Sequence, residues 1–356
     1  MEGWSVTDLE AVPGVGPAAA KKLREVFITT AELLSVQNPV ELQERTKLGE
    51  GTVAKIVRNA RDMTGKFGFR SGLEIEKEMQ TTPKLTTGLN AFDEALFGGI
   101  EAGSIIEFYG SARSGKTQWC AHLATRAQLP EDQGGLGGRV LWLDTESSFK
   151  PHVIRANALR WGLDPDAALG NIGRAQIVLS GQIEEIFETI PQLCAEQDYK
   201  LVIIDSLTGL FRAEYTGLDS LRIRQQDINK LLNGMRRTGT ATEAIFAYTN
   251  QVMAKIAVYG GNPNAPVGGH IVSHASDYRF YVRKSLKKKR KIDLRDNAGV
   301  PEFSKEFVLG WGGFYDDAKA CKESEAKIKK HFDKRGWGMR KVDDSSEEKS
   351  EEEAEG

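Results

Sequence analysis

One eight-residue segment constrains the fold of this 356-residue chain more than any other feature. Residues 110–117 read Gly-Ser-Ala-Arg-Ser-Gly-Lys-Thr, which fits the pattern Gly-x-x-x-x-Gly-Lys-[Ser/Thr]. A strand-length apolar run, Ile105–Tyr109, precedes the segment, and helix-compatible sequence, Gln118–Ala127, follows it. In that context the glycines let backbone N–H groups wrap a chain of phosphates at a helix N-terminus. The segment predicts a nucleoside triphosphate site, and a surface turn that fits the pattern by chance is the alternative.

Polar residues at this loop and at two later strand ends match the needs of phosphate chemistry. Lys116 is expected to reach the β- and γ-phosphates, and the Thr117 hydroxyl to help hold Mg²⁺. Asp205 ends an apolar run and is expected beside the metal, although a lone aspartate there is usually a turn residue. Glu146 is favoured to orient the attacking water, with Asp144 as the alternative. The residues expected at the nucleotide are Gly110, Ser111, Ala112, Arg113, Ser114, Gly115, Lys116, Thr117 and Gln118.

The middle of the chain alternates short apolar runs with helix-length segments. Five runs have strand length and are rich in β-branched or aromatic residues: Ile105–Tyr109, Val140–Leu143, Leu201–Ile204, Ala244–Tyr248 and Phe280–Val282. The first four alternate with helical patterns, which is typical of a parallel sheet buried between helices. We therefore predict an α/β core over residues 83–318 with a mostly parallel central sheet.

The flanking regions have a different texture. Residues 1–64 predict a small all-α unit, in which a Gly-x-Gly turn at Gly14 and Gly16 opens a helix and a fainter copy follows at Gly49 and Gly51. Residues 65–82 are expected to be a linker. Residues 319–356 are expected to form a charged helix and a disordered acidic tail.

Composition limits the classes of partner. No apolar run approaches the roughly 20 residues that span a bilayer, and the N-terminus lacks a secretory pattern, so no membrane partner is expected. Three distant cysteines favour neither a disulfide framework nor a zinc cluster. Residues 343–356 hold eight acidic residues and one lysine, so removing their −7 from the chain's −2 leaves about +5 on residues 1–342. A mildly basic body permits a polyanionic partner.

Six motifs, in consistent order, resemble those of the archaeal RadA-type recombinases and their eukaryotic counterparts, the DNA strand-exchange proteins of the RecA superfamily. The resemblance extends from the turn at residue 12 to about residue 317. Its motifs are Gly-Lys-Thr-Gln at 115–118, Trp-Leu-Asp-Thr-Glu at 142–146, Ile-Asp-Ser-Leu-Thr at 204–208, Tyr-Thr-Asn-Gln-Val at 248–252, Pro-Val-Gly-Gly-His-Ile at 266–271 and Arg-Lys at 283–284.

The resemblance implies a RecA-like ATPase core with a helix-hairpin-helix N-terminal domain. It implies a DNA-dependent ATPase that uses ATP and Mg²⁺ to form filaments or rings on single-stranded DNA and to pair it with a homologous duplex. Other recombination proteins are possible partners, and the site of action would be the archaeal cytoplasm beside the nucleoid or the eukaryotic nucleus. A regulatory paralogue that binds ATP and DNA without exchanging strands is the alternative, and a helicase-like or circadian-type ATPase is disfavoured.

The resemblance also assigns residues by position. Glu146 corresponds to the water-activating carboxylate, Gln251 to the γ-phosphate sensor and Asp296 to an aspartate that caps a neighbouring subunit's ATP. Segments Arg212–Gln225 and Val252–Ile271 correspond to two DNA-binding loops. The candidate DNA-binding residues are Arg212, Arg222, Arg224, Gly268, Gly269, Gly14 and Gly16. The cluster Lys287–Lys291 is either a DNA-steering surface or a charged hairpin tip.

Several positions depart from the family pattern. Its Phe-x-x-Ala oligomerisation segment is Phe-Arg-Ser-Gly here, from Phe69 to Gly72, which costs about 0.8 kcal/mol for the missing buried carbon. Leu218 replaces a basic residue in the first DNA loop, and Val153 stands where an arginine usually covers adenine. Asn297 and Ala298 replace Ser-Pro after Asp296. We therefore expect weakened subunit and DNA contacts around an intact ATP site.

Overall fold

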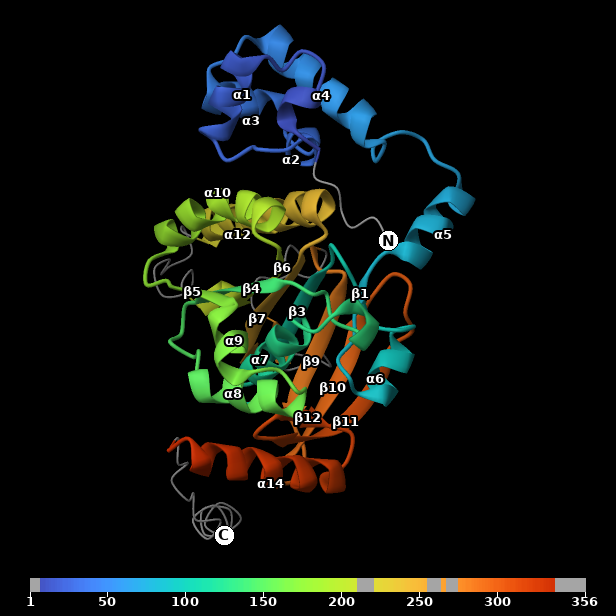
Figure 1. Ribbon diagram of the computed structural model, residues 1–356, viewed down its shortest axis with the longest axis vertical. Helices are drawn as coiled ribbons and strands as arrows, with labels where there is room; N and C mark the ends of the chain where they lie inside the picture. The colour runs from blue at the N-terminus through green and yellow to red at the C-terminus, as the bar shows by residue number, and fades with distance from the viewer. Residues whose placement is uncertain (1–6, 210–220, 255–263, 267–274, 337–356) are drawn as a thin grey trace.

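The computed structural model describes residues 7–209, 221–254, 264–266 and 275–336, which form a helical N-terminal part and an α/β core (Figure 1). The N-terminal part consists of the 3-10 turn η1 (Leu9–Ala11) and the helices α1 (Pro17–Arg24), α2 (Ala31–Ser35), α3 (Pro39–Thr46) and α4 (Glu50–Thr64). Gly14 has a positive φ of 93°, and Gly16 is the residue before α1. Leu9, Leu23 and Ile56 are buried in its apolar core. The predicted all-α N-terminal domain is confirmed.

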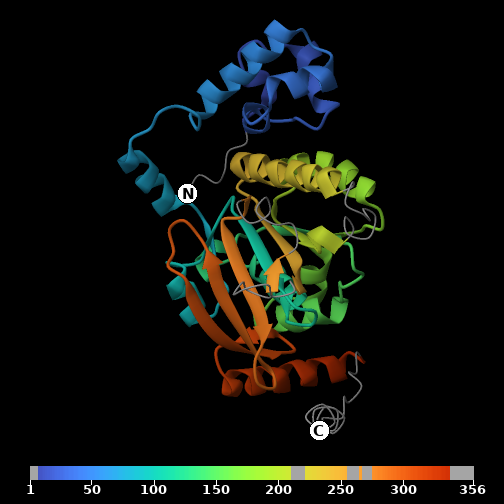
Figure 2. The same cartoon turned by 180° about the vertical axis from the view of Figure 1, so that it is seen from behind.

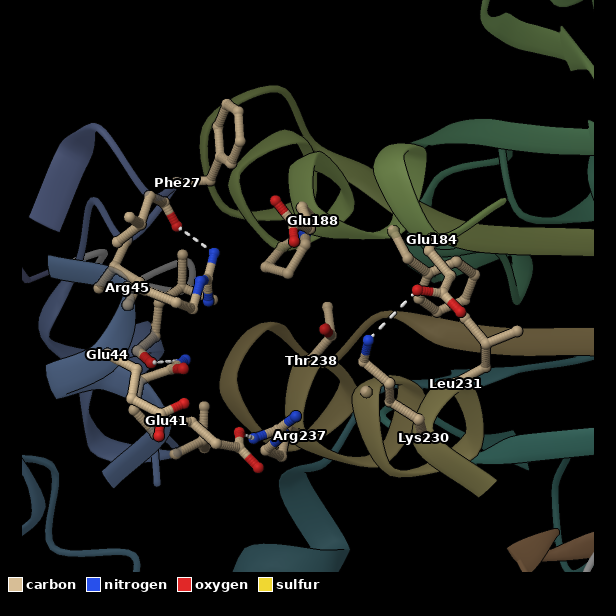
Figure 3. A pocket seen from close by; sticks show the side chains of 18 residues that line it. Phe27, Glu41, Glu44, Arg45, Glu184, Glu188, Lys230, Leu231, Arg237 and Thr238 are labelled. Atoms are coloured by element: carbon tan, nitrogen blue, oxygen red, sulfur yellow. Dashed lines mark hydrogen bonds and ion pairs between the residues drawn. The ribbon is translucent and has the colours of Figure 1, made fainter. Parts of the chain in front are cut away.

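The N-terminal part rests on helix α12 (Leu221–Thr242) of the core. Ala241 belongs to the N-terminal apolar cluster, and Arg237 Nη1 lies 2.9 Å from Glu41 Oε2. Between the two parts is a cavity of about 380 Å³, across which Figure 3 shows Arg237 pointing toward Glu41, while Lys230 points toward Glu184 within the core. Apolar packing at Ala241 and the ion pair between Arg237 and Glu41 therefore both join the two parts.

The predicted linker contains a helix that the sequence analysis missed. Helix α5 (Gly72–Thr81) begins with a capping box, in which Ser71 Oγ accepts from Glu74 N at 3.2 Å and Glu74 Oε2 accepts from Ser71 N at 2.7 Å. None of its residues is buried. Local capping therefore begins this helix without the apolar stripe by which packed helices are recognised.

A ten-stranded sheet forms the core (Figures 1 and 2). Its strands, from one edge to the other, are β12 (Gly313–Tyr315), β11 (Phe303–Gly310), β10 (Lys289–Asp296), β9 (Tyr278–Lys284), β3 (Ile105–Gly110), β7 (Ile245–Ala254), β6 (Tyr199–Asp205), β4 (Arg139–Asp144) and β5 (Ile172–Gln176), while β8 (Asn264–Pro266) pairs with β7. Pairing is parallel from β9 to β5 and antiparallel from β9 to β12. The mostly parallel α/β core and its five predicted strands are confirmed.

Helices cover both faces of this sheet. On one face, apolar side chains of α6 (Asn90–Ala95), α7 (Lys116–Arg126) and α8 (Pro151–Arg160) share a core with Phe108 and Trp142, and α9 (Pro165–Gly170) packs beside α8. On the other face, α10 (Ser180–Glu196) and α12 share a core with Val202 and Phe246. The remaining elements are η2 (Glu131–Gln133) and the two-stranded sheet of β1 (Lys84–Leu85) and β2 (Ile100–Glu101).

The C-terminal part of the core was less completely predicted. Strands β10 and β11 were missed because each contains several charged residues and only a short buried stretch, which in β10 is Ile292, Asp293 and Leu294. Residues 285–288 form the turn between β9 and β10, so Lys287 and Lys288 lie at a hairpin tip, while residues 289–291 begin β10. Helix α14 (Ala318–Lys334) is the predicted charged helix, and the acidic tail lies outside the described residues. No helix in the described ranges is long and apolar enough to cross a membrane.

A buried histidine connects the start of the core to its end. Phe314 N donates to His122 Nδ1 at 3.4 Å, so Nε2 carries the proton and donates to Thr87 O at 2.7 Å. Burial, aided by the charge of Arg160, holds the pKa of His122 well below its usual range. The ring is therefore neutral in the folded protein and joins α7 to β12 and to the segment before α6.

We expect His122 to make the protein sensitive to acid. The unfolded chain binds a proton near pH 6.5 that the folded chain excludes, so stability falls as the pH drops through that value. Between pH 7.5 and 5.5 the wild type should lose about 1.4 kcal/mol of unfolding free energy more than His122→Gln. Urea unfolding at the two pH values measures this difference. The matched control is exposed His152→Gln, which should follow the wild type; equal pH dependence in all three proteins would contradict the account.

Candidate nucleotide-binding site

The glycine-rich loop lies between β3 and α7, at the edge where the parallel strands end. A Cβ on Gly110 would lie 2.1 Å from Val282 O, and Gly115, just before α7, has a positive φ of 115°. Both positions therefore require glycine. The loop leaves the first turn of α7 open, and Gln118 lies half-buried within that turn. Its N–H groups and helix dipole make this edge suited to phosphate.

Lys116 lies folded over the loop. Its Nζ donates to Gly110 O at 3.0 Å and to Ser111 O at 2.9 Å. Burial lowers its pKa, and the nearby carboxylates of Asp205 and Glu146 oppose that effect. The ammonium is therefore held where phosphate oxygens can replace two carbonyls. Ser111, Ala112 and Arg113 are exposed beside it.

Asp205 is the centre of a hydroxyl cluster at the end of β6. Thr117 Oγ1 donates to its Oδ2 at 2.8 Å, Ser148 Oγ donates to the same atom at 2.6 Å, and Thr249 Oγ1 donates to Oδ1. Burial raises the pKa of Asp205, and these three hydroxyls oppose the rise. Sequence reasoning found Thr117 and Asp205 but missed Ser148 and Thr249, since an isolated hydroxyl residue carries no signal of its partner.

The donors present suit a nucleotide with Mg²⁺. Hydroxyl and carboxylate oxygens are the ligands that Mg²⁺ prefers. In the described residues no group of three or more His, Cys, Asp or Glu side chains could hold a metal. Thr117 and Asp205 would therefore bind the ion together with phosphate oxygens and water. Ser114 Oγ, within the loop, is fully buried and has no hydrogen-bond partner among the described residues, as expected where a ligand completes the site.

The two carboxylates after β4 have different surroundings. Arg174 holds Asp144 through Nε at 3.0 Å and Nη2 at 2.7 Å, and Ser148 N and Phe149 N also donate to it. Burial raises the pKa of Asp144, but the hydrogen bonds from Arg174 and the two backbone groups outweigh it, so the net shift is downward. These four hydrogen bonds, three at Oδ2 and one at Oδ1, hold Asp144 in place, which favours a structural role.

Glu146 is the more accessible of the pair. Its Oε1 accepts from Ser206 Oγ at 2.7 Å and from Gln251 Nε2 at 3.2 Å. The register of the sheet explains this meeting, because Gly110 pairs with Gln251 and Asp144 pairs with Asp205. The structure thus brings together Lys116, Thr117, Glu146, Asp205 and Gln251.

Asp296 does not join this group. It ends β10, which runs antiparallel to β9, and it pairs with Arg279 near the start of β9. Because β9 is parallel to β3, Asp296 lies at the edge where the parallel strands begin. There it lines a cavity of about 890 Å³ with Arg236 and Asp277. It therefore lies at the opposite edge of the sheet from the glycine-rich loop of its own subunit.

The candidate DNA and subunit contacts are only partly described. Gly14 and Gly16 are exposed at the turn before α1. Arg212, Gly268 and Gly269 lie outside the described residues, as do the side chains of Arg222 and Arg224. Phe69 is fully exposed, and a Cβ on Gly72 would meet nothing within 4 Å.

Because Asp144 and Glu146 have different surroundings, we expect their substitution to change the unfolding free energy by different amounts. Asp144→Asn should lower the unfolding free energy by about 1–3 kcal/mol, because it removes the charge that accepts two hydrogen bonds from Arg174 at Oδ2. Glu146→Gln should change it by less than about 0.5 kcal/mol, because its partners can bond to an amide. Urea unfolding at pH 7.5 measures both. A larger loss for Glu146→Gln than for Asp144→Asn would reverse the two assignments.

Comparison with known proteins agrees with this geometry. The sequence profile of the Rad51 family matches residues 78–317, and that of a SAM-like helix-hairpin-helix tandem matches residues 6–62. A relative from Methanocorpusculum labreanum, DNA repair and recombination protein RadA, is 39% identical over 323 residues, which cover 86% of this chain and 98% of the relative. The glycine-rich loop and the carboxylates around it lie within the matched region. The chain therefore belongs to the Rad51 family, as a RadA-type member of the RecA superfamily.

Proposed function

We propose that this chain is a DNA-dependent ATPase that forms ATP-dependent filaments on single-stranded DNA and catalyses homologous pairing and strand exchange. The observation that carries the proposal is the 3.2 Å contact between Gln251 Nε2 and Glu146 Oε1. This contact connects Glu146, which is expected to orient the water, with strand β7. The second segment expected at DNA, Val252–Ile271, begins within β7 and continues beyond its end. A change at the γ-phosphate thereby has a short route to the DNA.

The chain's own residues supply the steps of hydrolysis. Loop N–H groups and Lys116 bind the triphosphate of ATP, and Thr117 and Asp205 would hold Mg²⁺, which would neutralise charge on the phosphates. Glu146 accepts a hydrogen bond from the attacking water and so orients its lone pair toward the γ-phosphorus. Ser206 fixes the Glu146 carboxylate from the other side. The Gln251 amide is positioned to sense whether the γ-phosphate is present.

Assembly into a homo-oligomer follows from the location of Asp296. An aspartate at the edge where the strands begin is remote from its own loop, so it can cap only the nucleotide of another subunit. Phe69 is exposed before α5 and is the proposed anchor on a neighbouring subunit. Gly72 occupies the position at which the family pattern has alanine. A filament and a closed ring would both allow this contact between neighbouring subunits.

DNA contacts are proposed at three places. The exposed turn with Gly14 and Gly16 offers backbone N–H groups to a phosphate without sequence preference. Arg212, Arg222 and Arg224 in the first segment and Gly268 and Gly269 in the second complete the set. A second candidate function, an ATP- and DNA-binding mediator that does not exchange strands, is favoured by the glycine at position 72, because weaker docking between subunits opposes long filaments.

Two substitutions test the ATPase assignment. Lys116→Ala should abolish ATP binding and with it DNA-stimulated hydrolysis. Glu146→Gln should retain ATP binding but lower the DNA-stimulated kcat at least 100-fold, as loss of a general base does. Nucleotide binding by fluorescent ATP analogue and phosphate release measure the two effects separately. Normal ATP hydrolysis by either variant would contradict the assignment of these residues to the ATPase site.

Restoring the small side chain at position 72 tests the subunit contact. Gly72→Ala should tighten self-association about three- to fivefold, from the added buried methyl and the lost chain entropy. Sedimentation velocity with ATP and oligonucleotide measures the effect. Gly170→Ala is the matched control, since a Cβ there also meets nothing within 4 Å. Unchanged association of Gly72→Ala would remove Phe69–Gly72 from the interface.

A further inference from the structure

The centre of the sheet contains a buried carboxylate that the hydrolytic site does not use. Glu107, on β3, is 0% exposed. Its Oε1 accepts from Asn250 Nδ2 on β7 at 2.8 Å, and its Oε2 accepts from Arg279 Nε on β9 at 2.7 Å. One carboxylate therefore connects the two strands that flank β3.

Stability alone is a poor reason for this arrangement. Burying a carboxylate and a guanidinium costs several kcal/mol per ion, and an apolar replacement of similar volume is often as stable. Burial raises the pKa of Glu107, while Arg279 and Asn250 oppose the rise. The position lies between the apolar Ile105 and Tyr109 in a parallel strand, where β-branched residues are ordinary. A charged pair at such a place suggests a role in positioning.

The pair extends toward both edges of the sheet. At the edge where strands end, Asn250 Oδ1 accepts from Thr208 Oγ1 at 2.7 Å, and Asn250 directly precedes Gln251. At the other edge, Arg279 Nη1 lies 3.8 Å from Asp296 Oδ2. We call Thr208, Asn250, Glu107, Arg279 and Asp296 the polar ladder. It runs from the γ-phosphate side of one edge to the proposed neighbour-facing residue at the other.

Arginine is the residue type that this geometry requires. Its guanidinium donates through Nε to Glu107 while Nη1 faces Asp296, and it also lies 5.4 Å from the ring centroid of Tyr109. The side chain of Arg279 is only 12% exposed. A lysine carries one ammonium at the end of a flexible stem and cannot hold two carboxylates at these separate angles.

We propose that Arg279 is a positioning residue that connects the nucleotide state of one subunit to the nucleotide cap of the next. A shift of β7 at Gln251 moves Asn250, and Glu107 transmits that shift to Arg279, which orients Asp296 toward the neighbouring subunit's ATP. This inference rests on the proposed function, because Asp296 acts only in an oligomer. It predicts that Arg279 controls how tightly ATP is held between subunits and leaves the chemical step unchanged.

A double-mutant cycle on the full-length chain tests the ladder. Arg279→Lys, Asp296→Asn and the double variant are assayed for single-stranded-DNA-stimulated ATP hydrolysis over a range of ATP concentrations. Each single variant should raise the half-saturating ATP concentration about tenfold, with kcat within about twofold of wild type. The double variant should be no worse than Asp296→Asn alone, because both act through one contact. Arg295→Lys, beside Asp296 on β10 and paired with Asp293, should match the wild type.

A purely structural role gives a different pattern. In that case Arg279→Lys would lower the melting temperature and kcat while leaving the half-saturating ATP concentration unchanged. Alternatively, the half-saturating ATP concentration of the double variant would rise by the product of the two single effects. If either result is found while Asp296→Asn is impaired, the polar ladder is overturned, but the proposed function is not. An unaffected Asp296→Asn overturns the ladder and the capping role of Asp296, whereas a wild type without DNA-stimulated hydrolysis overturns the proposed function as well. If Arg279→Lys does not fold, Glu107→Gln takes its place in the same cycle.

Discussion

The parallel pairing of strands β3, β7, β6 and β4 is the constraint on which the rest of the molecule depends. Parallel strands end at a common edge, and their register sets Gly110 beside Gln251 and Asp144 beside Asp205. The glycine-rich loop, Asp205, Glu146 and Gln251, for which we propose roles in binding and hydrolysing ATP, come from four separate stretches of sequence. Strand pairing makes them neighbours, together with helix α7, whose first residues are Lys116 and Thr117.

The same pairing puts polar groups inside the sheet, where they must all be satisfied. Asp205 takes three hydroxyl donors, Asp144 takes an arginine and two backbone amides, and Glu107 takes an amide and an arginine. Each carboxylate is thereby fixed in one orientation. Glu146 accepts hydrogen bonds only from neutral side chains in the described residues, Ser206 and Gln251, which leaves it available to a water molecule.

Features that depend on local sequence could be predicted, whereas features that depend on contacts between distant segments could not. The glycine-rich loop, Asp205 and five strands were predictable, because local sequence carries both the motif and the apolar pattern. Ser148 and Thr249 were not, since their roles exist only when β4, β6 and β7 are side by side. Strands β10 and β11 were hidden because their charged residues find partners across the sheet, such as Lys289 with Glu306. Helix α5 was hidden because it is held by its capping box and buries nothing.

The central claim is that one edge of this sheet links ATP to the pairing of homologous DNA. The most direct measurement is joint-molecule formation by the full-length chain, with single-stranded DNA and a supercoiled duplex, alongside electron microscopy of the same mixture. The account predicts regular helical filaments and joint molecules that require both ATP and sequence homology. ATP hydrolysis and DNA binding without joint molecules, from rings or single subunits, would contradict it and leave a mediator role.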